Sequence, residues 1–152
     1  MAYPNIFEAS TTRDLHNRID KLSPLTQRLW GKMGVAEMLA HCAMPYRQIL
    51  GEQFTPPSFF MKWLVKNFFK TSMVNEVPYK KNLPTSPAFV IREEKNFEQE
   101  KNNLKQYIQK IQEMGRDAFE GREQTTIGKL SSKEWNNLLY KHLDHHLQQF
   151  GV

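Results

Sequence analysis

Two histidines spaced four residues apart near the end of the chain carry the clearest chemical signal in the sequence. His142 and His146 fall on the same helical stripe as Trp135 and Leu139, within a segment that has helical periodicity over residues 132–150. An i, i+4 pair brings both imidazoles to one side of a helix, where they can share one metal ion. The simpler alternative is a pair that faces water. Burial on an apolar stripe argues against it, because each unpaired buried polar group costs ~1–3 kcal/mol.

A two-histidine site is incomplete, since zinc-type sites use a third protein ligand and keep one position for water or substrate. The remaining histidines are His16, His41 and His145. Helical period turns His16 away from its own apolar face and puts His145 near the border of its stripe. His41 falls at the edge of the apolar stripe of its helix. Spacing alone therefore favours His41 only weakly and leaves the third ligand open.

Three further residues near these histidines have two interpretations each. Gln149, one turn beyond His146, is either a hydrogen-bond partner of a ligating imidazole or a helix-end amide in water. Glu37, one turn before His41, is a fourth ligand, an outer carboxylate or a helix cap at position N3. Cys42, the single cysteine, is expected to be a small core residue.

The elements that must position these residues are predominantly helical. Periodicity and capping signals predict long helices over about 11–22, 34–51, 96–114 and 132–150, a shorter helix over about 56–70, and an extended piece at 88–91. Capping boxes are expected at Thr11 with Asp14 and at Ser131 with Glu134. Four long helices with few strands predict an all-α fold, a four-helix bundle formed by one domain over residues 1–152.

Two motifs resemble those of the DinB-like metal-binding bundles. They are WGKM at 30–33 followed by MLAHC at 38–42, and YKHLDHHLQQFG at 140–151 with its His-x-x-x-His-x-x-Gln core. They lie near the two ends of the chain, so the resemblance covers nearly all of it and is closest to an uncharacterised bacterial branch. It implies up-down-down-up topology, a short extra helix between helices 2 and 3, and a divalent cation held by His41, His142 and His146.

The resemblance also implies a reaction class. Relatives include thiol-dependent S-transferases and isomerases, and others have been proposed as hydrolases. A site of three imidazoles would hold zinc or nickel, or alternatively iron or manganese, and would activate water or a low-molecular-weight thiol. The alternative is a non-catalytic metal- or ligand-binding bundle that acts as a dimer. The absence of an obvious general base favours it, as does Gln124–Gly128, where relatives tend to carry His-Pro-x-Phe-Gly.

Composition excludes several other classes. The 152 residues carry one cysteine, 21 Lys+Arg and 16 Asp+Glu, a net charge of +5, so a disulfide scaffold is excluded and no nucleic-acid motif is present. Neither a signal peptide nor a membrane span is visible, and we expect a cytoplasmic protein that forms a homodimer and binds a small molecule.

Much of the positive charge lies in one aromatic segment, residues 59–70, with lysines at 62, 66 and 70. We expect this segment to pack on the bundle, cover the site or form a dimer contact, and membrane-surface binding is the lesser alternative.

Overall fold

The computed structural model describes residues 2–52, 55–85 and 89–152. Its described helices are α1 (Ala9–Asp20), α2 (Val35–Ile49), α3 (Phe59–Phe68), α4 (Lys70–Val74), α5 (Phe97–Met114) and α6 (Ser132–Gln149), with a 3-10 turn η2 (Arg116–Phe119). The strands β1 (Glu123–Gln124) and β2 (Gly128–Lys129) form a two-stranded antiparallel hairpin. The predicted all-α class is confirmed.

Helix boundaries follow the capping signals at three of the four long helices. Ser131 and Glu134 form the predicted capping box of α6, and the side chain of Asn96 accepts a hydrogen bond at the start of α5. Helix α2 begins after Gly34 and continues through Pro45, as the periodicity predicts. The N-terminal helix differs, because α1 begins two residues before Thr11.

The capping box predicted at Thr11 is therefore wrong. Thr11 and Thr12 lie inside α1 and are buried, and Glu8 is the N-cap residue, with no capping hydrogen bond from its side chain. Because α1 begins at Ala9, both threonines lie within its first turn or just after it and face the protein interior.

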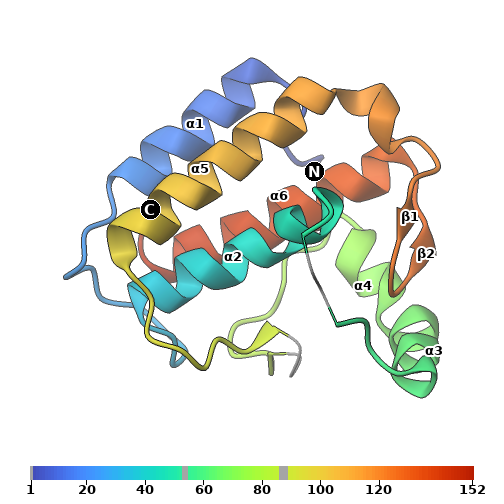
Figure 1. Ribbon diagram of the computed structural model, residues 1–152, viewed down its shortest axis with the longest axis horizontal. Helices are drawn as coiled ribbons and strands as arrows, with labels where there is room; N and C mark the ends of the chain where they lie inside the picture. Colours follow the sequence, from blue (N-terminus) through green and yellow to red (C-terminus); the bar gives the residue numbers. More distant parts are fainter. Residues whose placement is uncertain (1, 53–54, 86–88) are drawn as a thin grey trace.

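The four long helices lie alongside one another around one hydrophobic core (Figure 1). Helix α5 packs against both α1 and α2, and α6 packs against α2 and α4. The fully buried side chains include Leu15, Ile19, Met38, Leu39, Cys42, Leu104, Ile108, Ile111, Leu139, Leu143 and Leu147. The predicted packing role of Cys42 is confirmed.

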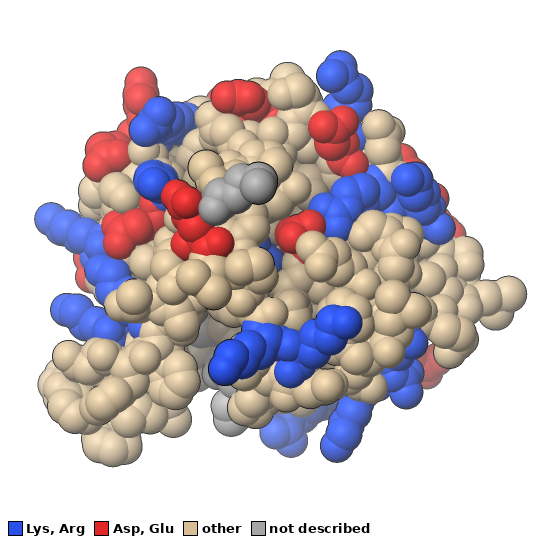
Figure 2. Space-filling model, turned by 180° about the vertical axis from the view of Figure 1, so that it is seen from behind, with Lys and Arg blue, Asp and Glu red and all other residues tan. Residues whose placement is uncertain are grey.

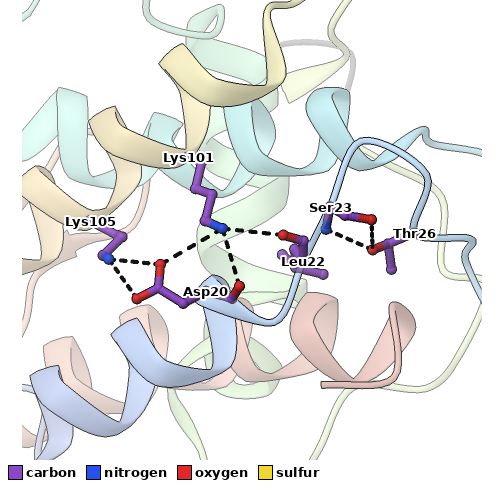
Figure 3. A network of polar contacts seen from close by, with 6 residues as sticks. All are labelled: Asp20, Leu22, Ser23, Thr26, Lys101 and Lys105. Atoms are coloured by element: carbon purple, nitrogen blue, oxygen red, sulfur yellow. Dashed lines mark hydrogen bonds and ion pairs between the residues drawn. The ribbon is translucent and has the colours of Figure 1, made fainter.

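A polar network ties the end of α1 to α5 (Figure 3). Lys105 Nζ donates to both carboxylate oxygens of Asp20 at 2.8 Å, and this hydrogen bond lowers the pKa of that carboxyl. Lys101 Nζ donates to the backbone carbonyls of Asp20 and Leu22 at 3.3 and 3.2 Å. These carbonyls end α1, so the lysine satisfies acceptors that the helix leaves free.

Three connecting segments differ from the sequence prediction. The helix expected over 56–70 begins three residues later, at Phe59, and breaks at Phe69 into α3 and α4, which ends at Val74. The β1–β2 hairpin was not predicted, since two-residue strands leave no periodicity to detect. Of the extended piece 88–91, Ala88 lies outside the described residues, and residues 89–91 form no strand.

Over the described residues, no helix combines the length and the apolar character needed to cross a membrane.

Candidate metal centre

Helices α2 and α6 bring three histidines from distant parts of the chain into one cluster. His41 comes from the buried face of α2, and His142 and His146 come from successive turns of α6. The ring centroids lie 4.8 Å apart for His41–His142, 4.7 Å for His41–His146 and 4.9 Å for His142–His146. One candidate ligand atom from each residue lies within 4.8 Å of the other two. This is the three-histidine set that the family resemblance implied.

A backbone carbonyl fixes the orientation of His41. The residue is 4% exposed, and its Nδ1 lies 2.9 Å from the carbonyl oxygen of Phe89. A carbonyl can only accept, so Nδ1 carries the hydrogen and the neutral ring presents an unprotonated Nε2. Metal ligands are commonly oriented in this way, by a hydrogen bond from the second ring nitrogen.

A chain of two hydrogen bonds fixes His146 in the same tautomer. Gln149 Nε2 donates to the carbonyl of Trp30 at 2.8 Å, which turns Gln149 Oε1 toward the histidine. His146 Nδ1 then donates to that oxygen at 2.8 Å and leaves its own Nε2 unprotonated. Gln149 thus takes the partner role that was one of its two interpretations.

Gly31 is what allows this arrangement beside Gln149. Its backbone has φ +80, and a Cβ at that position would overlap Gln149 Nε2. Glycine is the residue that meets both requirements, a left-handed conformation and a close approach. Trp30 and Gly31 of the early motif therefore help to orient His146 on the last helix: the Trp30 carbonyl holds Gln149, and Gly31 leaves room for it.

His142 is the incompletely satisfied member of the cluster. Its Nε2 lies 2.9 Å from Nε2 of His41, and because the His41 nitrogen is unprotonated, His142 must donate in the metal-free state. Its other nitrogen, Nδ1, is buried and has no hydrogen-bond partner among the described residues. A cation bound through Nε2 of both His41 and His142 would replace the contact between these two nitrogens, which lie 2.9 Å apart.

Burial keeps the cluster neutral, as metal ligation requires. Burial lowers the pKa of His41, and it lowers the pKa of His146 to about 3, with repulsion from His41 adding to the shift. The pKa of His142 falls well below its usual value for the same reason, with His41 and His146 adding to the effect. At neutral pH all three rings therefore offer lone pairs rather than charges.

The structure separates the other candidate ligands from this cluster. The Glu37 carboxylate accepts from the Gly34 amide at 2.8 Å, a capping contact, and among the described residues it belongs to no group of potential ligand atoms. His16 Nε2 lies 3.0 Å from the carbonyl of Lys105, between α1 and α5. The His145 ring lies 5.2 Å from that of His146 and contacts Trp30 and Tyr79, but among the described residues His145 belongs to no group of potential ligand atoms.

Sequence reasoning missed Lys141, which anchors the segment beside the site. It is 1% exposed, and its Nζ donates to the carbonyls of Ser72, Asn75 and Val77 at 2.7, 2.9 and 3.2 Å. Burial lowers the pKa of Lys141 to about 8, so the ammonium group remains charged at neutral pH. Helical period places Lys141 about 100° from the centre of the α6 apolar stripe, so no pattern could have found it.

The backbone carbonyls of Trp30 and Phe89 were also missed, because a carbonyl has no sequence signature.

The chain was compared with known proteins. No family model, no curated protein and no solved structure matches it.

Proposed function

We propose that this protein is a divalent-metal-dependent enzyme with the four-helix, up-down-down-up architecture of the DinB-like bundles, and that His41, His142 and His146 hold the ion. The observation that carries the proposal is the orientation of the cluster. His41 and His146 each donate through Nδ1 to a fixed oxygen and so present an unprotonated Nε2, and Nε2 of His142 lies 2.9 Å from that of His41. Zinc or nickel suits three neutral imidazoles best, and iron or manganese is the alternative.

The proposed chemistry is activation of water or of a low-molecular-weight thiol, in an S-transferase or hydrolase reaction. When bound, a divalent ion held by three imidazoles keeps a coordination position open and lowers the pKa of the group bound there. The chain itself positions the ligands: the Phe89 carbonyl and Gln149 hold two rings in one tautomer, and His41 and His146 are 4 and 8% exposed.

The second candidate is a non-catalytic metal- or ligand-binding bundle that acts as a dimer. The observation that favours it is the position of Glu37, because its carboxylate caps α2 and so leaves the site without an evident general base.

Cobalt substitution separates the two candidates. We expect the visible spectrum of the Co(II)-loaded protein to change when a low-molecular-weight thiol is added, with a new thiolate-to-cobalt absorption. That result would demonstrate an exchangeable position and justify thiol-transfer and hydrolysis assays. A cobalt spectrum that neither thiol nor pH alters would indicate a closed site and support the non-catalytic alternative.

A further inference from the structure

Helix α3 presents an aromatic surface that the rest of the protein leaves uncovered. None of its residues is buried, and Phe59, Phe60, Trp63 and Phe68 are 87, 67, 49 and 66% exposed. Figure 1 places α3 at one end of the molecule, below the hairpin, and Figure 2 shows a projecting lobe at that end without charged side chains on the visible face. We expected this segment to pack on the bundle, but its aromatic side chains remain exposed.

The inward side of α3 is half-buried rather than buried. Lys62, Leu64 and Val65 are half-buried, and Val65 packs against the hydrophobic core. At ~100° per residue, Phe59, Phe60 and Trp63 fall within an arc of roughly 100° on the side of the helix opposite Val65. The helix therefore packs on the protein through its half-buried side and turns these three aromatic residues outward.

Lysines line the border of this aromatic face. Lys62 and Lys66 lie one turn apart on α3, and Lys70 follows at the start of α4. No carboxylate of the described residues lies within ion-pair distance of any of the three, and residues 55–75 contain neither Asp nor Glu. Lys70 Nζ donates to the backbone carbonyl of Lys129 at 3.4 Å, a contact that leaves its charge uncompensated.

Aromatic side chains beside unpaired lysines fit the boundary between lipid headgroups and acyl chains. A second copy of the chain fits less well. A symmetric contact through α3 would bring the same lysines together, and the segment has no acidic residue to pair with them.

We propose that α3 binds this protein peripherally to anionic lipid bilayers. The aromatic face enters the headgroup region, and the lysines on its border lie at the level of the lipid phosphates. This inference does not depend on the metal centre, and a protein without metal would still bind.

Vesicle co-sedimentation of the full chain tests the proposal. We expect binding to phosphatidylcholine vesicles that contain phosphatidylglycerol, weakened by salt, and little binding to phosphatidylcholine alone. The double variant Lys62→Gln, Lys66→Gln should bind about 20- to 30-fold more weakly, at roughly fivefold per lysine. The matched control Lys21→Gln, Lys110→Gln removes two exposed lysines elsewhere and should bind nearly as wild type.

Trp63 supplies a second readout. Its emission should shift to shorter wavelength when anionic vesicles are added, and Trp63→Phe should lose that shift, because Trp135 is already buried and Trp30 is half-buried beside Gln149, away from α3. The variant Phe59→Ala, Phe60→Ala should lose binding with an unchanged melting temperature.

Three results would overturn the proposal. One is no binding to anionic vesicles at low salt, and another is equal weakening by both lysine pairs. The third is a lipid-free dimer in sedimentation that Phe59→Ala, Phe60→Ala dissociates, which would make this surface an interface between copies.

Discussion

The histidine cluster and helix α3 place their side chains in opposite ways. At the cluster, polar rings lie among core residues of α2 and α6, and four of the six ring nitrogens have a hydrogen-bond partner among the described residues. On α3, large aromatic rings lie in solvent, and none of the helix residues is buried. Each region departs from the usual distribution, in which polar groups lie outside and apolar groups inside.

Both departures indicate binding, but of different kinds. Burying three polar rings beside one another is costly, so the convergence of His41, His142 and His146 indicates a small ligand inside the protein. An exposed aromatic surface points to a large ligand outside it. Lys141 lies beside His142 on α6 and donates to carbonyls at the end of α4, the helix that directly follows α3.

The largest contrast should appear in core and surface truncations. Leu139→Ala on α6 removes a fully buried side chain and should lower the free energy of unfolding by about 2–5 kcal/mol. Phe59→Ala on α3 should change it by less than about 0.5 kcal/mol. Urea denaturation measures both, and a comparable loss for Phe59→Ala would show that α3 is packed rather than exposed.

Removal of the Lys141 ammonium group should weaken the attachment of the end of α4 to α6. Lys141→Met leaves the carbonyls of Ser72 and Asn75 without their donor and should cost about 2–3 kcal/mol. The amides of α4 should exchange hydrogen faster. Lys133→Met is the control, because the Lys133–Glu76 ion pair is largely exposed and should contribute less than about 1 kcal/mol. Equal protection of α4 in both variants would contradict the anchoring role.

Acid should destabilise the metal-free protein through the cluster. The pKa of His146 is about 3 in the folded state against 6.5 when exposed, so the unfolded chain takes up the proton first as the pH falls. Stability is complete above pH 6.5 and is lost progressively toward pH 3. By pH 5 this residue alone should remove about 2 kcal/mol. His146→Gln should show a shallower decline, and a flat profile between pH 7 and pH 5 for the wild type would refute the burial of neutral imidazoles.

The smallest difference in stability is expected between alanine substitutions at two glycines, and it should be accompanied by a change in metal affinity at only one of them. Gly31 and Gly51 have nearly the same φ, +80 and +81, but a Cβ at Gly51 meets nothing within 4 Å. Alanine at either position incurs the left-handed strain. Gly31→Ala should cost about 1 kcal/mol more than Gly51→Ala and weaken metal binding about 10- to 100-fold through Gln149. Equal metal affinity in the two variants would show that the orientation of Gln149 does not matter.

The sequence predicted what periodicity and capping encode. The apolar stripes gave four long helices, Ser131 and Glu134 marked the start of α6, and the i, i+4 spacing put His142 and His146 on one face. Spacing alone could not choose the third histidine, because the position of His41 depends on how α2 packs against α6. The carbonyl partners at Trp30 and Phe89 are common to every residue type and could not be predicted. The break between α3 and α4 at Phe69 lacks a proline or glycine signal.

The central claim is that His41, His142 and His146 bind one divalent cation, and metal content measures this most directly. Untagged protein would be incubated with zinc or nickel, freed of excess metal and analysed by elemental mass spectrometry beside His142→Ala and His16→Ala. The account predicts about one metal per chain in the wild type and in His16→Ala, because His16 lies between α1 and α5, and a loss of metal in His142→Ala. No metal in the wild type, or metal retained by His142→Ala, would contradict the claim.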